Sequence, residues 1–366
     1  MLPPREGFSP EAVGAIGLLV HRLSRPDDLV LGRAIAETPF LDRRYSPVRP
    51  LSWPPHLRLR GPGIRHAAGV ATILQQARPG LVEVHNRPEI ASYLARRFPR
   101  LPVILVLHND PQGMRRARTA WQRSQLARRV HVVTVSEHLR QRFLEGLAGT
   151  TRVDVLPNCL DLAALPPHLP MPDRGRLILF AGRLVADKGA DSFVAACARA
   201  LPQLPGWRAE MIGADRFHQA AADTPFLTRL RVAAAEAGVS LPGYRPHQAV
   251  LESMARAAIV VVPSRWPEPF GLTALEAMAC GAALVASDRG GLAELVRDAA
   301  LVIDPDRPDL LGDALVGLAR SEPERIRLAA AGLARSAGFD LPAARSRLAA
   351  IRAQVLAAVS ARAGSG

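Results

Sequence analysis

The fold of this chain can be worked out starting from PSRWPEPFGLTALEAMACGAALVA, residues 263–286. The preceding residues, 258–262, are all apolar, which predicts a strand buried on both faces. Pro263, Pro267 and Pro269 forbid a helix directly after that strand, because proline removes a backbone donor and restricts the residue before it. We therefore expect a rigid loop at the C-terminal end of a buried strand.

A helix and a second strand should follow this loop. Gly271 opens a helix over residues 272–279, and the apolar residues 283–286 predict the next strand. This order places Glu268 on the loop and Glu276 on the helix at the rim of a parallel sheet, where open α/β sheets bind ligands. The free amides at the start of the helix can hold an anion or a sugar hydroxyl.

Glu268 and Glu276 are separated by seven residues, with PFG after the first and EAMACG around the second. This element resembles the E-x7-E motif of retaining glycosyltransferases of family 4 (the glycosyltransferase group 1 type). The alternative is a surface glutamate and a helix glutamate that lie at this spacing by chance. The resemblance implies an α/β protein of the GT-B fold, with two Rossmann-like domains facing across a cleft and a C-terminal helix that returns to the N-terminal domain.

The resemblance also sets the expected domain boundaries. Residues 1–164 with the helix 342–362 should form the N-terminal Rossmann-like acceptor domain. Residues 165–341 should form the C-terminal Rossmann-like domain that binds the nucleotide-sugar donor, with the Pro-rich segment 165–175 as linker. The last helix has a predicted buried stripe made of Leu348, Ile351, Val355 and Leu356.

Composition indicates a protein of a reducing compartment. The 366 residues suffice for two domains that each bury a core. Cys159, Cys197 and Cys280 are far apart in apolar or small-residue surroundings, so we expect reduced packing residues in a cytoplasmic protein. We expect no signal peptide, because residues 1–10 are polar and Pro-rich. The longest apolar run near them, residues 13–20, falls short of the roughly 20 residues that a membrane span needs.

The positive charge of the chain is concentrated in its N-terminal part. The net charge is +14, and residues 1–165 carry 24 Arg against 13 Asp and Glu, a net of +11. An arginine-rich genome raises Arg everywhere but does not explain this asymmetry. A basic half predicts an acidic partner, which can be a lipid phosphate, an anionic membrane surface or nucleic acid.

The segment 112–129 carries much of this charge and is predicted to be a helix with an inner stripe of Met114, Trp121 and Leu126. One interpretation is a basic helix that rests peripherally on the inner face of the plasma membrane or grips a lipid-diphosphate acceptor. The other is a solvated helix face. Nucleic-acid binding is disfavoured, because Trp121 is the one aromatic residue in the segment and no stacking platform accompanies it.

Two consecutive predicted strands, 81–84 and 102–107, each end in a His-Asn pair. Parallel strands end at the same edge of a sheet, so these side chains predict a polar site there. The string LHND resembles the family's His element, which places His108 beside the donor sugar and the anomeric carbon as a catalytic residue. The candidates for acceptor binding are His85, Asn86, Arg87, Asn109, Asp110, Arg115 and Arg116. Arg87 has the alternative of pairing with Glu83 or Glu89.

The N-terminal segment should contain a helix from about Pro10, with Ser9 as its N-cap. In the family a glycine-rich loop here faces the donor diphosphate, and Gly14 is the candidate equivalent, although the usual Gly-Gly pair is absent. Close helix packing is the alternative role of Gly14. There is little room for a first strand before this loop.

The loop AGRLVADKG, residues 181–189, resembles the family's GRL…KG phosphate clamp. The resemblance implies that Gly182 brings the backbone close to the ligand and that Arg183 and Lys188 neutralise the nucleotide diphosphate. Lys188 is the only lysine of the chain, which indicates that this position requires a compact point charge. A surface pair of Asp187 with Arg183 is the alternative.

Three further elements resemble those of the family. Gly213 follows the predicted strand 208–212, as in the loop under the nucleotide. Gly290 and Gly291 resemble the glycines of a GG-x-x-E turn. In LPNCLD, Cys159 stands where glycine is usual, which leaves the backbone angle there open.

The resemblance implies a mechanism without metal or cofactor. Glu276 would bind the ribose hydroxyls of a UDP or GDP sugar, since a carboxylate can accept two hydrogen bonds from a diol. Glu268, with catalytic Arg183 and Lys188, would hold the sugar and the diphosphate while the leaving phosphate oxygen takes the acceptor proton. The amides that assist are those near Phe270, Gly271, Leu272 and Thr273.

The acceptor is expected to be a glycan or a lipid-linked glycan in cell-surface polysaccharide or lipopolysaccharide synthesis. The alternatives are another GT-B sugar-nucleotide enzyme, such as an epimerase or a phosphorylase with a cofactor lysine, and a basic nonenzymatic nucleic-acid-binding protein. The sequence does not indicate an oligomeric state.

Overall fold

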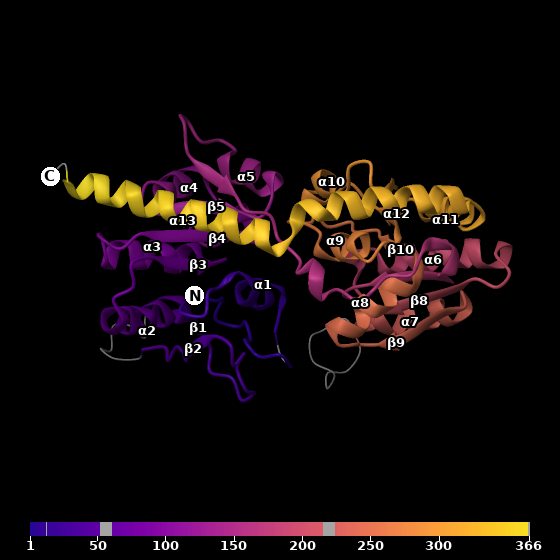
Figure 1. Cartoon of the computed structure of the whole chain (residues 1–366), viewed down its shortest axis with the longest axis horizontal. Helices are drawn as coiled ribbons and strands as arrows, with labels where there is room; N and C mark the ends of the chain where they lie inside the picture. Colours follow the sequence, from indigo (N-terminus) through magenta and orange to yellow (C-terminus); the bar gives the residue numbers. More distant parts are fainter. Residues whose placement is uncertain (12, 52–60, 215–223, 365–366) are drawn as a thin grey trace. The chain divides into compact units, whose positions relative to one another are not determined.

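The computed structural model describes residues 1–11, 13–51, 61–214 and 224–364. The chain divides into two compact units, Met1–Cys159 with Leu341–Gly366, and Leu160–Asp340 (Figure 1). The Pro-rich segment 165–175 lies within the second unit.

The second unit is built on a parallel sheet of six strands in the order β12-β11-β10-β7-β8-β9. Its strands are β7 (Gly175–Ala181), β8 (Arg208–Ile212), β9 (Val239–Gly243), β10 (Ala257–Val262), β11 (Ala283–Ala286) and β12 (Leu301–Val302). All six residues of β10 are buried, as the apolar run 258–262 predicted. The chain winds outward from β7 in one direction and from β10 in the other, so the order reverses between these two central strands.

Helices connect and cover these strands. They are α6 (Ala190–Ala200), α7 (Pro225–Glu236), α8 (His247–Arg256), α9 (Leu272–Ala279), α10 (Gly291–Val296), α11 (Pro308–Arg320) and α12 (Glu322–Ser336). Helix α6 packs between α7 and α11, and α9 packs between α8 and α12. The core that they enclose contains Phe180, Phe193 and Leu328, each nearly inaccessible to solvent. The strand, helix and strand predicted for residues 258–286 are confirmed.

The first unit contains a parallel sheet in the order β3-β4-β5-β6 and a separate parallel pair, β1 and β2. The strands are β1 (Leu29–Gly32), β2 (Arg44–Pro47), β3 (Val82–His85), β4 (Val103–Leu107), β5 (His131–Thr134) and β6 (Val153–Val155). The helices are α1 (Ala15–Leu23), α2 (Gly61–Ala77), α3 (Pro88–Arg97), α4 (Ala120–Ala127), α5 (Glu137–Leu144) and α13 (Leu341–Gly364). Met1 and Leu2 bond to both groups of strands: the Leu2 amide donates to Leu31, and the His85 amide donates to Met1.

The first helix begins later than the sequence predicted. Ser9 and Pro10 precede it outside any helix, and α1 starts at Ala15. The reason is a cap from elsewhere in the loop, because Glu6 Oε1 accepts the amide of Gly17 at 2.9 Å. A distant carboxylate therefore takes the role that the sequence assigned to Ser9.

The basic segment 112–129 is not one helix, which corrects that prediction. Helix α4 covers Ala120–Ala127 only, and it begins at a capping box in which Thr119 and Gln122 exchange hydrogen bonds. The expected inner stripe is also wrong at Trp121, which is 69% exposed. Arg123 faces inward instead, and its guanidinium donates to the carbonyls of Ala117, Arg118, Phe143 and Glu145.

The three cysteines are all buried, as expected of packing residues. Burial raises the pKa of the Cys280 thiol to about 12 and raises that of Cys197 further. Cys159 is not among the non-glycine residues of positive φ, so the replacement of the family's glycine needs no unusual backbone angle.

Helix α13 returns to the first unit, as the resemblance implied (Figure 1). Leu348, Ile351 and Val355 of the predicted stripe are buried, whereas Leu356 is exposed. The helix is also attached by charge, since Arg352 donates to both carboxylate oxygens of Glu83, at 2.7 and 2.9 Å. A bidentate pair of this kind combines two charge-assisted hydrogen bonds in one geometry.

Replacing Arg352 by Met should destabilise the first unit. The change leaves Glu83, whose side chain is 14% exposed, without its bidentate partner, which costs about 3 kcal/mol of unfolding free energy. The measurement is the urea midpoint of unfolding. The matched control is Arg347→Met, an exposed residue of the same helix; equal midpoints for the two variants would show that the pair contributes nothing.

Candidate active site

The candidate site of the second unit lies where the strand order reverses. Lys188 is on the loop after β7, and Glu268 is on the loop after β10, so both follow the carboxyl ends of the two central strands. In open parallel sheets this switch point is the place where ligands bind. The two loops that the sequence singled out separately thus meet at one position.

Glu268 is held in a fixed orientation. Its side chain is largely buried, and Oε1 accepts Lys188 Nζ at 2.5 Å and Ser264 Oγ at 2.7 Å. Both bonds involve Oε1, which leaves Oε2 to accept from a ligand. The ion pair also places the only lysine of the chain directly beside the carboxylate.

The backbone brings the two loops together. The Asp187 carbonyl accepts the amides of Arg265 and Trp266 at 2.9 and 3.0 Å. Gly189 has φ +70°, and a Cβ there would lie 1.9 Å from the Pro263 carbonyl oxygen. This approach explains why glycine follows Lys188, because a side chain would push the Lys188 loop away from the end of β10.

The turn at Gly290 and Gly291 supports Glu268 from its other side. The Glu268 amide donates to Arg289, and the Gly291 amide donates to the Glu268 carbonyl at 2.6 Å. Gly290 has φ +66°, and a Cβ there would lie 2.6 Å from the same carbonyl oxygen. The bend predicted from the glycine pair thus serves to hold the Glu268 backbone.

Glu276 has a partner that the sequence did not suggest. It lies on α9, its side chain is 12% exposed, and Oε1 bonds to His247 Nε2 at 2.7 Å. His247 begins α8 and is far more exposed than Glu276. The contact fixes one carboxylate oxygen and leaves the other for a hydroxyl group.

Arg183 is an exposed cation on the same loop as Lys188. Within the described part of the chain it makes no ion pair with Asp187, so the alternative of a surface pair is not observed. Gly182 and Gly213 lie against each other, since a Cβ at Gly213 would be 1.8 Å from the Gly182 carbonyl oxygen.

The start of α9 completes this rim. Gly271 is its N-cap, and Leu272 and Thr273 are its first residues, both partly accessible. Phe270 is buried instead, and its ring meets that of Phe339 edge to face at 5.7 Å. The role of Phe270 is therefore to anchor the loop, while the backbone around it remains available.

Arg265 anchors the same loop to its surroundings. Its guanidinium donates to Asp191 at 2.6 Å and to Asp306 at 2.9 Å, and these bonds raise its pKa. Ser264, Arg265 and His247 were not predicted from the sequence. Position directly after a buried central strand was a usable signal for the first two, whereas the His247–Glu276 contact joins residues 29 positions apart without a local pattern.

In the first unit the two predicted histidines are in contact. His85 Nδ1 lies 3.0 Å from His108 Nε2, and both side chains are buried. Asn86, in the left-handed region at φ +59°, accepts the His108 amide with its side chain. Burial lowers the pKa of His108 to about 4 and lowers that of His85 as well. The pair is therefore neutral at physiological pH, and one ring donates to the other.

The other acceptor candidates do not form one cluster. Asp110 caps the Gln112 amide and binds Arg142 at 2.8 Å. Arg87 donates to the Asn86 carbonyl, so the pairing alternatives with Glu83 and Glu89 are not observed among the described residues. Asn109, Arg115 and Arg116 are exposed.

Gly14 lies at the N-cap of α1. A Cβ there would be 2.4 Å from Glu6 Oε1, so the glycine makes room for the carboxylate that caps the helix. In the structure the Glu6 carboxylate accepts hydrogen bonds from the backbone amides of Gly14 and Gly17, and its partial burial raises its pKa.

Two family profiles match consecutive parts of this chain. Glycosyltransferase Family 4 matches residues 20–164, and Glycosyl transferases group 1 matches residues 164–335. Together the two profiles cover residues 20–335. The chain belongs to the glycosyltransferases of family 4 and group 1, as its E-x7-E element indicated.

Curated relatives cover part of the chain. The lipopolysaccharide core biosynthesis mannosyltransferase LpcC of Rhizobium leguminosarum is 32% identical over 58% of this chain and 59% of that protein. The putative glycosyltransferase YtcC of Bacillus subtilis is 26% identical over 66% and 64%. An exopolysaccharide phosphotransferase of Streptomyces coelicolor is 34% identical over 52% and 20%. The chain thus spans between 20% and 64% of the length of these relatives.

Solved structures resemble almost the whole chain. Sucrose-phosphate synthase from Thermosynechococcus elongatus gives a TM-score of 0.78 at 18% identity and covers 98% of both chains. Anabaena HepE in complex with UDP and glucose gives 0.74 at 19% identity, over 96% of this chain and 98% of that chain. The likeness concerns the fold and confirms two Rossmann-like domains of the GT-B type.

The described residues contain neither a group of three or more His, Cys, Asp and Glu placed to hold a metal ion nor a helix long and apolar enough to cross a membrane.

The histidine pair should make the first unit less stable in acid. With a folded pKa of about 4 and an unfolded pKa of about 6.5, His108 binds fewer protons in the folded state between these values. Unfolding free energy should therefore fall by about 2 kcal/mol between pH 7.5 and pH 5, measured by urea unfolding. His108→Gln should flatten this slope, and the exposed His168→Gln should not; equal slopes in all three proteins would contradict the assignment.

Proposed function

We propose that this protein is a retaining glycosyltransferase that transfers a sugar from a nucleotide-diphosphate donor without a metal ion. The observation that carries the proposal is the pairing of Lys188 with Glu268 at the switch point of the sheet, at 2.5 Å. A buried carboxylate and a cation at one rim provide a sugar-hydroxyl acceptor and a phosphate ligand side by side. Arg183 adds a second cation with no competing ion pair among the described residues.

The donor would be held in three parts. Glu276, fixed by His247, presents its free oxygen to the ribose hydroxyls. Glu268 Oε2 and the backbone from Gly271 to Thr273 hold the sugar hydroxyls. Lys188 keeps ammonium protons beyond the one given to Glu268, and these reach the diphosphate together with Arg183.

The reaction step follows from this arrangement. The bond between the anomeric carbon and the leaving phosphate oxygen breaks while the acceptor oxygen bonds to the same face of that carbon. The leaving oxygen takes the acceptor proton, so the products are the glycoside and the nucleoside diphosphate. Arg183, Lys188 and the amide of Thr273 stabilise the charge that grows on the diphosphate.

The substrates are part of the proposal. The UDP bound in the HepE structure supports a UDP sugar as donor. LpcC and the exopolysaccharide phosphotransferase support an acceptor in lipopolysaccharide or polysaccharide synthesis. We assign the acceptor to the first unit, where the neutral His108 would contact the donor sugar. We further propose that the protein is cytoplasmic.

Donor binding should appear as thermal stabilisation. One of a set of UDP, GDP and ADP sugars at 100 times its Kd should add about 2.7 kcal/mol. Glu276→Ala should abolish the shift, while the exposed Glu236→Ala control on α7 should keep it. Absence of a shift with every donor would refute the assignment of the second unit.

The Lys188–Glu268 pair should matter in the transition state. Lys188→Ala should lower kcat by a factor of about 10² to 10³, and a chelator should leave the wild-type rate unchanged. Retention is checked by the anomeric coupling in the NMR spectrum of the product. An inverted product would overturn the proposed stereochemistry while leaving donor binding intact.

We also propose that the first unit contacts an anionic membrane surface. Arg115, Arg116 and, five residues further along the chain, Trp121 are all exposed, a combination of cations and an aromatic ring that suits the membrane interface. In liposome flotation, Arg115→Gln with Arg116→Gln should weaken binding to anionic vesicles by about thirtyfold. The control is Arg100→Gln with Arg347→Gln, two exposed arginines of the same unit; equal recovery on neutral and anionic vesicles would refute the electrostatic contact.

A further inference from the structure

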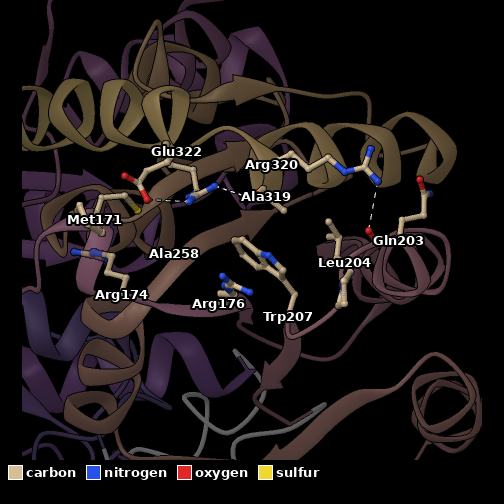
Figure 2. Close-up of a pocket in the computed structure, with 13 residues that line it drawn as sticks. Met171, Arg174, Arg176, Gln203, Leu204, Trp207, Ala258, Ala319, Arg320 and Glu322 are labelled. Carbon is tan, nitrogen blue, oxygen red and sulfur yellow. Dashed lines mark hydrogen bonds and ion pairs between the residues drawn. The ribbon is translucent and has the colours of Figure 1, made fainter.

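A pocket of the second unit lies away from the candidate active site. It has a volume of about 440 Å³ and is lined at the amino ends of β7, β8 and β10 (Figure 2). The candidate active site follows the carboxyl ends of the same strands. Because β7 has seven residues and a strand rises by about 3.3 Å per residue, the two sites are roughly 20 Å apart.

The charge in this pocket is strongly unbalanced. Four arginines line it against a single glutamate, Glu322. The arginines are Arg174, Arg176, Arg320 and Arg325. Glu322 is itself half exposed, and its nearest approach to Arg325 is 3.9 Å, so it neutralises the cluster weakly.

Arg325 is the central group. Its residue is 8% exposed, and Nη1 donates to the carbonyls of Leu318 and Ala319 at 2.6 and 2.8 Å. Its Nε is buried and has no hydrogen-bond partner among the described residues. A buried guanidinium donor without an acceptor is costly, and the positive charge of Arg325 favours an anion in the pocket. Burial and the nearby charge of Arg176 lower the pKa of Arg325.

Arg174 has a different role. Its guanidinium donates to the carbonyls of Leu169, Met254, Ala257 and Cys280. These bonds connect the segment before β7 to α8, to the start of β10 and to the end of α9. Its hydrogen bonds are thus made to the protein, but its charge remains. It adds to the positive potential of the pocket without being a ligand.

An aromatic ring forms one wall of the pocket. Trp207 lies half buried just before β8 (Figure 2). The guanidinium carbon of Arg325 is 5.4 Å from the centre of its ring. Apolar side chains, Met171, Leu204 and Ala258, complete the lining. A simple inorganic anion would use the arginines but leave this wall unused.

We propose that this pocket binds a small organic phosphate monoester, with its phosphate on the guanidinium groups of Arg176 and Arg325 and its ring against Trp207. Arg320 donates to the Gln203 carbonyl at 3.4 Å and contributes its charge to the pocket. Guanidinium groups match the geometry and charge of a phosphate dianion better than that of a singly charged carboxylate. The volume is in the range of small-ligand sites, and a sugar phosphate or a nucleoside monophosphate has the required chemistry. This site is independent of the proposed transfer reaction.

The experiment is calorimetric titration of the full chain at low salt with glucose 6-phosphate, adenosine 5′-monophosphate, inorganic phosphate and glucose. We expect at least one of the esters to bind more tightly than inorganic phosphate, and glucose not to bind. The ester that binds more tightly tells whether the ligand is a sugar phosphate or a nucleoside monophosphate. Arg176→Gln with Arg320→Gln should weaken ester binding by about tenfold or more, since the double change removes one charge-assisted contact and a second positive charge from the pocket.

The matched control is Arg229→Gln with Arg307→Gln, which removes the same charge from exposed positions of the same unit. Equal ester affinity in the two double variants would overturn the proposal. It would show that the ester binds outside this pocket, for example at the proposed donor site. Failure of both esters to bind the wild-type protein would also overturn it. Inorganic phosphate binding as tightly as the esters would refute the contact of a ring with Trp207.

A second measurement does not depend on the arginine variants. Trp207 fluorescence should change when the ester binds, and Trp207→Phe should remove that change while keeping a ring in the wall. An unaltered response in Trp207→Phe would place the ligand elsewhere.

Discussion

The candidate active site of the second unit depends on the ion pair between Lys188 and Glu268. Each residue lies on a separate loop, and the loops follow adjacent strands at the point where the winding of the sheet reverses. The pair orients the carboxylate, brings a cation close to it and ties the two loops. The glycines at 189 and 290 allow the backbones around the pair to approach more closely than any other residue would permit.

The sequence predicted the second unit more accurately than the first for a physical reason. Between residues 257 and 286 the signals are local: a buried apolar run, prolines that exclude helix and glycines that end it. In the first unit the ends of elements are set by distant groups. Glu6 caps α1, and the buried Arg123 orders α4, although its residue type and the run of arginines around it indicated an exposed face.

The candidate site shows the same division. Residues within motifs, such as Lys188 and Glu268, could be named from the sequence, because their spacing reflects one loop each. Their mutual contact could not, since it joins positions 80 residues apart. Partners that complete the site, such as His247 for Glu276, depend on how α8 packs beside α9, and a pattern in either helix alone does not contain that information.

The burial of all three cysteines has a practical consequence. A thiol that is shielded from solvent reacts with an alkylating reagent only when its surroundings open. Cys159 belongs to the first unit, and Cys197 and Cys280 belong to the second. The natural chain thus contains a chemical reporter in each half, and the rates at which the thiols are labelled would tell which half opens first.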